Sequence, residues 1–198
     1  MESPSFHSIL IFLGAYLIGS FPTGVVLSRQ KYGMDVREMG SGNIGATNVT
    51  RVFGWYAGIV TLLIDFAKGY VPIFLLHRFY PAQEWLLTFA SISLVVGHCF
   101  SIFLKFQGGK GVATGLGTVM VLSPVCGAIA IGVYAVVVLV SKISALGSLA
   151  GILSCVVFLW KTEPPEPILF LIAGVSSIVL ARHTGNIKRL IFDRKEKT

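Results

Sequence analysis

Apolar runs of about twenty residues recur along almost the whole chain, separated by short polar connections. A helix needs about 20 apolar residues to cross the hydrocarbon core of a bilayer. The chain has 198 residues, of which 54% are hydrophobic and only 13% charged, a composition too apolar for a soluble domain. We therefore expect an all-α integral membrane protein, folded as one bundle and one domain over residues 1–198. The apolar runs lie at about 5–28 (interrupted by Pro22), 55–79, 84–104, 112–140, 143–160 and 167–181.

The run at 112–140 is too long for one ordinary membrane crossing. A continuous helix of this length would exceed the bilayer core, and Pro124 would interrupt its backbone hydrogen bonds. If the run crosses twice, nearly all basic residues of the connections and the tail share one side, and only Arg78 and Lys161 lie on the other. The positive-inside rule favours this arrangement, as two short crossings or one re-entrant hairpin. The prediction is seven transmembrane segments, two of them (about 112–140) short, with the N-terminus outside and the C-terminus in the cytoplasm.

The net charge of +7 does not indicate nucleic-acid binding. The basic residues are spread over the connections between apolar runs and do not form one basic face with interleaved aromatic residues. The three cysteines, Cys99, Cys126 and Cys155, are widely spaced in apolar surroundings and lack the spacing of metal ligands. We therefore expect no nucleic-acid partner, no metal site and no cofactor.

The least apolar segment is 40–51, which reads Gly-Ser-Gly-Asn-Ile-Gly-Ala-Thr-Asn-Val-Thr-Arg. Glycines let a backbone turn with positive φ and approach a ligand closely, and successive N–H groups in such a turn can bind an anion. Hydroxyls and amides add donors, and the guanidinium of Arg51 suits phosphate. The segment is either a phosphate cradle or a flexible polar loop between membrane helices. Its candidate ligands are Gly40, Ser41, Gly42, Asn43, Gly45, Thr47, Asn48 and Arg51.

A second glycine-rich turn, at 105–111, directly precedes the run at 112–140. It resembles a Walker A motif but fails the spacing, because Leu104 stands where the first glycine belongs and Gly111 follows the lysine. ATP hydrolysis is therefore not indicated. A lysine among small residues at a helix start still favours an anion, because helix N-termini present N–H groups and a positive dipole end. The candidates for phosphate binding here are Gly108, Gly109, Lys110 and Gly111.

Charged and titratable residues also occur within or beside the apolar runs. Asp65 and Lys68 are three residues apart, so they share one face of a helix. Charges in a membrane segment usually face the bundle interior or a wet cavity. The two residues therefore form a buried ion pair, or Lys68 contacts a substrate anion. His98 and His183 lie near the expected cytoplasmic ends of their segments, where an imidazole can serve as a general base or as a structural hydrogen-bonding group.

Three separated stretches together resemble one protein family. They read GSGNIGATNVTR at 40–51, GHCFSIFLKFQGGKGVAT at 97–114 and RHTGNIKRL at 182–190. They are similar to the three cytoplasmic motifs of the bacterial acyl-phosphate:glycerol-3-phosphate acyltransferases, the PlsY family. LIDFAKG at 63–69 is similar to the second-helix signature of that family. One departure is Ser101, where the family commonly has proline.

The resemblance implies transfer of a fatty acyl group from acyl phosphate to the 1-hydroxyl of sn-glycerol 3-phosphate. The products would be lysophosphatidate and phosphate, in the first step of phospholipid synthesis. The base is either a histidine or a phosphate oxygen of the substrate itself. The residues implied in catalysis are Ser41, Asn43, Thr47 and His183; those implied in phosphate binding include Arg51, Lys68, Lys110 and Asn186; Asp65 and His98 are supporting residues.

The implied partners are glycerol 3-phosphate, fatty acyl phosphate and membrane lipid. The implied setting is the bacterial inner membrane, with a monomeric chain whose active site faces the cytoplasm. A small anion transporter is the competing class, but it should place polar groups at the midplane and on both sides. Here the polar groups gather on one side, apart from Asp65 and Lys68. A purely structural scaffold would not need so many donors in two loops.

Overall fold

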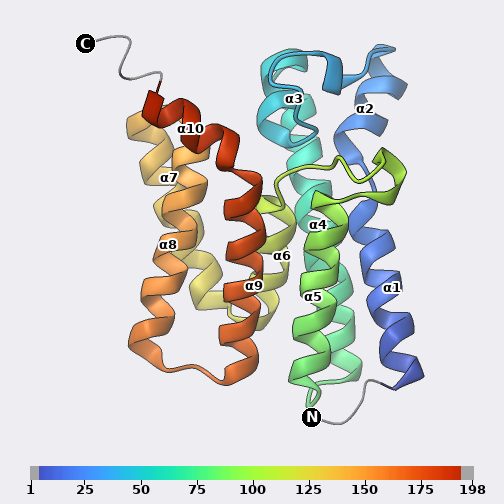
Figure 1. Ribbon diagram of the computed structural model, residues 1–198, viewed down its shortest axis with the longest axis vertical. Coiled ribbons are helices and arrows are strands. Elements are labelled where there is room, and N and C mark those ends of the chain that lie inside the picture. The colour runs from blue at the N-terminus through green and yellow to red at the C-terminus, as the bar shows by residue number, and fades with distance from the viewer. Residues whose placement is uncertain (1–4, 193–198) are drawn as a thin grey trace.

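The computed structural model describes residues 5–192, and every regular element in that part of the chain is helical. Figure 1 shows these elements as one bundle of roughly parallel and antiparallel helices. In chain order they are α1 (Phe6–Ser20), α2 (Thr23–Tyr32), the 3₁₀ helix η1 (Val36–Glu38), α3 (Ala46–Phe53), α4 (Trp55–Phe79), α5 (Glu84–Cys99), the 3₁₀ helix η2 (Ile102–Leu104), α6 (Val112–Leu122), α7 (Pro124–Ser141), α8 (Ser144–Thr162), α9 (Glu166–Arg182) and α10 (Thr184–Phe192).

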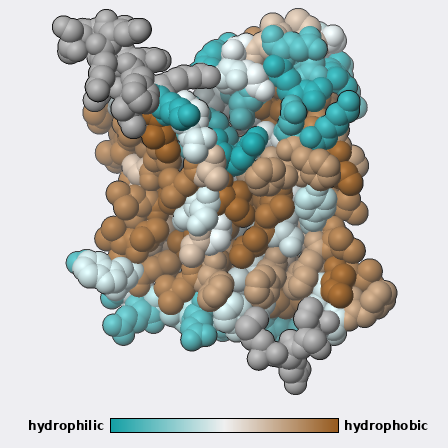
Figure 2. Space-filling model, in the orientation of Figure 1, coloured by the Kyte–Doolittle hydropathy of each residue, from teal (hydrophilic) through white to brown (hydrophobic). Residues whose placement is uncertain are grey.

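Five described helical stretches are long and apolar enough to cross a membrane. They are Phe6–Tyr32, Trp55–Phe79, Glu84–Leu104, Pro124–Ser141 and Ser144–Thr162. On the face shown in Figure 2, hydrophobic residues form a brown band across the middle of the molecule, with hydrophilic residues above and below it. An apolar band bounded by two polar ends is the surface that a bilayer requires. The all-helical membrane fold is thus confirmed, while the count of seven crossings and the orientation of the termini stay predictions.

The run at 112–140 divides into two helices, α6 and α7, at Ser123. Pro124 occupies the first position of α7, where the missing N–H of proline costs no hydrogen bond. The expectation that both segments are short is wrong for α7, because its 18 residues make it long enough to span a membrane. Only α6, with 11 residues, is short.

The first apolar run is interrupted where the sequence places Pro22. The ring of a proline clashes with a preceding carbonyl and removes a backbone donor, so α1 ends at Ser20 and α2 begins at Thr23. The break leaves the carbonyl oxygen of Phe21 available to a side chain, and Nζ of Lys68 donates to it over 2.8 Å.

The main core cluster lies between α5, α6, α7, α8 and α9. Two smaller clusters connect α1, α4 and α5, and α2 with the segment that leads into α3. Figure 1 shows α3, α10 and the α5–α6 connection toward one end of the bundle, and the α4–α5 and α8–α9 connections at the other. Both glycine-rich segments and the start of the tail therefore meet at one end. The described buried residues of the main cluster are Val95, Cys99, Val119, Cys126, Cys155, Leu159, Leu171, Ile172, Val175 and Val179.

Candidate active site

A cavity of about 730 Å³ opens among α3, α4 and the helices from α6 to α10. Its walls toward the middle of the bundle are apolar and include Leu116, Val119 and Ile172. Its other part collects the polar residues singled out from the sequence. Those that line it are Ser41, Asn43, Gly45, Thr47, Asn48, Arg51, Asp65, His98, Lys110, Gly111, His183 and Asn186. The remaining candidates, Gly40, Gly42, Lys68, Gly108 and Gly109, are not among its lining residues.

The first glycine-rich segment is organised around the side chain of Asn48. Its Nδ2 donates to the carbonyl oxygens of Val36 (3.2 Å), Met39 (3.0 Å) and Asn43 (2.9 Å). Its Oδ1 accepts from the backbone N–H of Ser41 over 2.8 Å. Asn48 is only 2% exposed. The amide of Asn48 therefore holds the segment in shape from within, although the residue borders the cavity.

Most backbone donors that the sequence suggested for an anion nest are used inside this segment. The N–H of Ser41 goes to Asn48, that of Gly42 to Met39 (3.0 Å), and that of Gly45 to Oδ1 of Asn43 (2.9 Å). Gly40 and Gly42 have φ of 59° and 71°, which supports the expected positive-φ turn. The segment lines the cavity with several side chains and with the N-terminus of α3. The N–H groups in the first turn of a helix favour an anion.

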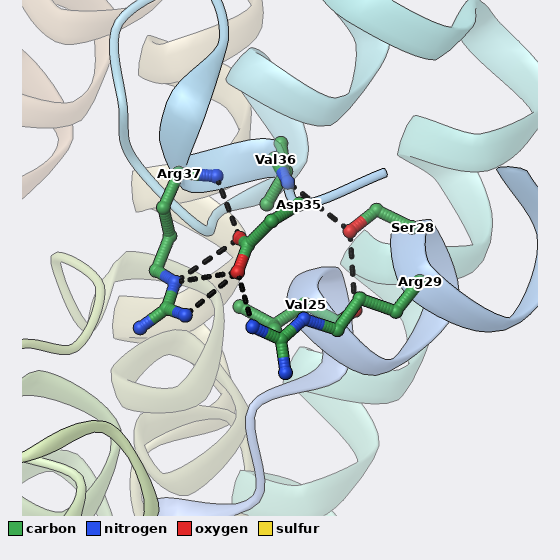
Figure 3. Close-up of polar contacts among 6 residues, drawn as sticks. All are labelled: Val25, Ser28, Arg29, Asp35, Val36 and Arg37. Carbon is green, nitrogen blue, oxygen red and sulfur yellow. Dashed lines mark hydrogen bonds and ion pairs between the residues drawn. The ribbon is translucent and has the colours of Figure 1, made fainter. Parts of the chain in front are cut away.

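The glycine-rich segment is anchored to α2 by a cluster of charges (Figure 3). Arg37 and Arg29 donate to Oδ2 of Asp35 over 2.6 Å and 2.7 Å. The hydrogen bonds from Arg37 hold the pKa of the Asp35 carboxyl well below its usual range, so this carboxylate stays charged at any physiological pH. Oγ of Ser28 accepts from the N–H of Val36 over 3.2 Å. The residues just before Gly40 are thereby fixed to the end of α2.

Thr47 joins α3 to the far wall of the cavity. Its Oγ1 lies 3.0 Å from Oγ of Ser144, at the start of α8, which in turn lies 3.0 Å from the hydroxyl of Tyr134 on α7. Arg51 is one helical turn after Thr47 on the same face of α3. Sequence reasoning missed Tyr134 and Ser144, because each lies in a long apolar run that contains other scattered hydroxyl residues, and neither belongs to a motif.

Asp65 and Lys68 form a buried ion pair, with Nζ of Lys68 2.8 Å from Oδ1 of Asp65. The same carboxylate oxygen accepts from Oγ1 of Thr23 over 2.8 Å, and the ammonium also donates to the carbonyl of Phe21. Of the two alternatives that the sequence left open, the geometry favours the ion pair, since the ammonium of Lys68 contacts Asp65 and the carbonyl of Phe21, and Lys68 is not a lining residue of the cavity. Asp65 itself borders the cavity.

His98 is buried between this ion pair and the second glycine-rich turn. Its Nδ1 lies 3.8 Å from Oδ1 of Asp65, beyond hydrogen-bond range, and has no hydrogen-bond partner in the part of the chain that the structure describes. A methyl group on Gly109 would overlap Nε2 of His98. Gly109 is therefore required by close packing against the imidazole.

The second glycine-rich turn does not present the N–H groups of its first two glycines to the cavity. The N–H of Gly108 donates to the carbonyl of Cys99 over 3.1 Å, and that of Gly109 to the carbonyl of His98 over 2.9 Å. Their proposed role in phosphate binding is thus replaced by a structural one. Lys110 and Gly111, the next two residues, do line the cavity, at the start of α6.

His183 is the C-cap residue that directly follows α9, and it is 1% exposed. Its Nδ1 lies 2.8 Å from the carbonyl oxygen of Val179. A carbonyl oxygen only accepts, so Nδ1 carries the hydrogen and Nε2 is left as the acceptor of the neutral ring. Burial lowers the pKa of His183 below its ordinary value and keeps the ring neutral. Asn186 follows on α10 and borders the same cavity.

Together these residues define a class of protein: a helical membrane protein in which three cations, Arg51, Lys110 and Lys142, and a neutral histidine border a cavity whose lining is otherwise mostly apolar. Such a site suits an amphiphile with an anionic head, because guanidinium and ammonium groups bind phosphate while the walls hold a hydrocarbon chain. Among the described residues, no group of three or more His, Cys, Asp or Glu could hold a metal ion.

Comparison with known proteins identifies the family. Residues 9–193 match the family model described as glycerol-3-phosphate acyltransferase. The glycerol-3-phosphate acyltransferase of Aquifex aeolicus is 35% identical over 96% of this chain and 98% of its own length. That of Myxococcus xanthus is 45% identical over 92% and 95%. The chain belongs to the glycerol-3-phosphate acyltransferase family.

Two solved structures share this fold. One is the crystal structure of PlsY (YgiH), an integral membrane glycerol 3-phosphate acyltransferase, in its glycerol 3-phosphate form, with a TM-score of 0.90 and 36% identity over 95% of this chain and 94% of that one. The other is PlsY in a lysophosphatidic acid form, with a TM-score of 0.87 and 34% identity over 95% and 93%. The family resemblance inferred from the sequence motifs is therefore confirmed.

Proposed function

We propose that this protein transfers a fatty acyl group from acyl phosphate to the 1-hydroxyl of sn-glycerol 3-phosphate, with its active site on the cytoplasmic side of a bacterial inner membrane. The observation that carries the proposal is a cavity with one cationic end and an apolar remainder. Both substrates bear a phosphate, and one of them also bears a long hydrocarbon chain. The family and the two PlsY structures, in glycerol 3-phosphate and lysophosphatidic acid forms, support the acceptor and the product.

Arg51 and Lys110 approach the polar end from different elements, α3 and the start of α6, and so can engage a phosphate from two directions. We assign phosphate binding to these two cations together with Asn186. Ser41, Asn43 and Thr47 border the same end, and we assign to them the contacts with the acyl carbonyl and its developing oxyanion. The glycines of both turns and Asn48 form the frame that holds these side chains.

In the proposed step, the 1-hydroxyl oxygen attacks the acyl carbonyl carbon. A new ester C–O bond forms, the C–O bond to the phosphoryl group breaks, and the proton of the hydroxyl ends on a phosphate oxygen directly or by way of a base. Acyl phosphate is a mixed anhydride with a good leaving group, so positioning and charge stabilisation supply most of the rate.

Two groups can take the hydroxyl proton. Nε2 of His183 is the acceptor nitrogen of a neutral ring that borders the cavity, which fits a general base. A phosphate oxygen of the substrate is the other candidate. A His183→Ala variant that keeps most of its kcat would exclude the histidine and leave the phosphate.

The ion pair between Asp65 and Lys68 argues against the transporter alternative. These were the charged residues expected deep in the membrane, and they neutralise each other within the bundle. They therefore do not provide the unpaired polar groups near the membrane midplane that a transporter needs to bind its substrate. The cations that line the cavity, Arg51, Lys110 and Lys142, lie in α3, just before α6 and directly after α7.

The test is product formation by the purified monomer in detergent, with radiolabelled glycerol 3-phosphate and either palmitoyl phosphate or palmitoyl-CoA. Lysophosphatidate from palmitoyl phosphate alone would support the proposal, and product from palmitoyl-CoA alone would overturn the donor. Arg51→Gln should raise the KM for glycerol 3-phosphate. Arg78→Gln, which removes an exposed charge at the other end of α4, is the matched control and should not.

A further inference from the structure

Arg182 is the last residue of α9 and directly precedes His183, yet its side chain reaches away from the tail to the second glycine-rich turn. Its Nε donates to the carbonyl oxygen of Gly109 over 3.0 Å, and its Nη2 donates to that of Gly108 over 2.8 Å. Its guanidinium carbon lies 5.4 Å from the ring centroid of Phe100. In the part of the chain that the structure describes, Arg182 makes no salt bridge.

Both glycines that Arg182 holds have their backbone N–H and their carbonyl oxygen hydrogen-bonded. Their N–H groups donate to the carbonyls of His98 and Cys99 at the end of α5, while their carbonyls accept from the guanidinium of Arg182. These backbone groups are therefore already hydrogen-bonded within the protein and are not the groups that bind a substrate. The turn is a clasp between α5 and α9, which we call the Gly108–Gly109 clasp.

The clasp fixes the backbone next to two residues that line the cavity. Lys110 follows Gly109 immediately and leads into α6. His183 follows Arg182 immediately, and its ring is oriented by Val179 one turn earlier on the same helix. Through one side chain, the structure thus sets the spacing between the backbone of Lys110 and that of His183. Figure 1 shows the α5–α6 connection passing the end of α9 where this occurs.

We propose that Arg182 is a positioning residue for the acyl transfer, which holds Lys110 and His183 at the separation that a bound glycerol 3-phosphate requires. This inference rests on the proposed function. Arg182 touches no substrate in this role and acts only through the Gly108–Gly109 clasp. Arginine suits the task because its planar fork donates two hydrogen bonds in fixed directions, whereas lysine is a single point charge on a flexible stem.

The clasp is proposed to act on residues that bind the phosphate of glycerol 3-phosphate, so a loosened clasp should weaken the binding of this substrate. In Arg182→Gln we expect the KM for glycerol 3-phosphate to rise about tenfold, which corresponds to the loss of one hydrogen bond from a charged group. The kcat should change less than KM. Arg182→Lys can satisfy one carbonyl at a time and should fall between Arg182→Gln and the wild type.

A merely structural role would give a different pattern. It would reduce the fraction of folded enzyme and hence the apparent kcat, while the remaining molecules would keep the wild-type KM. Lys188→Gln is the matched control, because it removes an exposed positive charge from α10 without touching the clasp. Its KM should stay at the wild-type value.

Hydrogen–deuterium exchange tests the Gly108–Gly109 clasp with a measurement that does not depend on the catalytic activity of the enzyme. In the wild type the amides of Gly108 and Gly109 should exchange slowly, because both are hydrogen-bonded to α5. In Arg182→Gln and Arg182→Lys they should exchange faster, while peptides from α1 and α4 stay unchanged. If Arg182→Gln does not fold, the comparison of Arg182→Lys with the wild type carries the test.

The outcomes are separable. A raised KM with faster exchange in the clasp supports the proposal, whereas wild-type KM or unchanged exchange in both Arg182 variants overturns it even if the wild-type enzyme is fully active. An inactive wild type would instead refute the proposed function, and exchange would then still report whether Arg182 holds the turn.

Discussion

Replacing Asn48 with alanine should destabilise the protein, because this side chain holds the first glycine-rich segment together. The sequence suggested that Asn48 contacts phosphate, but in the structure its amide is fully engaged with the protein itself. Its two N–H donors are shared among three backbone carbonyls, and its Oδ1 accepts from the N–H of Ser41. Alanine removes all of these contacts at once and leaves their backbone partners unsatisfied.

The size of the effect follows from the number of bonds. A neutral hydrogen bond contributes about 0.5–1.5 kcal/mol net, so two N–H donors and one acceptor contribute about 1.5–4.5 kcal/mol in total. The lower half of this range applies, because Ser41 is exposed and water can replace part of what is lost. A loss of about 1.5–3 kcal/mol lowers the melting temperature of a protein of this size by about 3–12 °C.

The measurement can use the cysteines of the protein. Cys99, Cys126 and Cys155 are all free and buried, so a thiol-reactive fluorogenic dye reports unfolding in detergent as an apparent melting temperature. Asn43→Ala is the matched control, because its side chain accepts one hydrogen bond, from the N–H of Gly45. It should lower the melting temperature by only a few degrees.

A direct role in substrate binding would produce the opposite result. If Asn48→Ala melts within about 2 °C of the wild type and shows a raised KM for glycerol 3-phosphate, the side chain binds substrate and the structural account is refuted. If the melting temperature falls well beyond that of Asn43→Ala, the hydrogen bonds seen in the structure are what stabilise the segment.

Three more predictions follow from buried groups near the site. Gly109→Ala should lower both activity and melting temperature, because the new methyl group would overlap Nε2 of His98; an unchanged melting curve would contradict this. Burial lowers the pKa of His183 below its ordinary 6.5, so the fold favours the neutral ring. Between pH 6.5 and that lowered pKa, only the unfolded chain takes up the proton. Thermal stability should therefore fall as the pH drops through this range. In kcat/KM, any acidic limb that depends on His183 should lie below pH 6.5, and a limb above it would count against the assignment. Lys68→Met should destabilise by about 3–5 kcal/mol, more than the double variant Asp65→Asn/Lys68→Met, because the single change leaves a buried carboxylate unpaired; equal losses in a double-mutant cycle would argue against the pair.

The sequence was sufficient to predict the membrane class and most residues that meet at the cavity, because both depend on strong local signals. Long apolar runs are typical of spanning helices, and Pro124 marked the break between α6 and α7. It did not indicate that the two helices differ in length: α6 has 11 residues, whereas α7 continues to Ser141 and has 18.

The roles of the glycine-rich segments could not be predicted in the same way. A glycine needed for phosphate and a glycine needed for close packing look the same in a single sequence. Only the fold shows that Gly109 packs on His98, and that its N–H and carbonyl are already bonded. Likewise, Arg182 was part of a recognised motif, but its link to residues more than seventy positions earlier depends on how α5 and α9 pack.

Ser101 shows how a departure from a family pattern can be read once the backbone is known. Its φ of −64° is the value that a proline ring imposes, so serine here keeps the geometry expected of the family. The hydroxyl adds a hydrogen bond of 2.6 Å to the carbonyl of Ser20. At the start of η2, the hydrogen bond of the Ser101 hydroxyl thus takes the place of the rigid ring that a proline would supply.

The ion pair between Asp65 and Lys68 also bears on how α4 enters the bilayer during synthesis. An isolated Asp or Lys near the middle of an inserting segment costs about 2.5–3.5 kcal/mol on insertion scales. These two lie one turn apart on the same helix, so each charge meets its counter-charge before any later segment has been made. Their other partners here, Thr23 and the carbonyl of Phe21, belong to the segment that precedes α4 in the chain. The charges of the bundle can therefore be neutralised in the order of translation, and insertion of α4 need not wait for the second half of the protein.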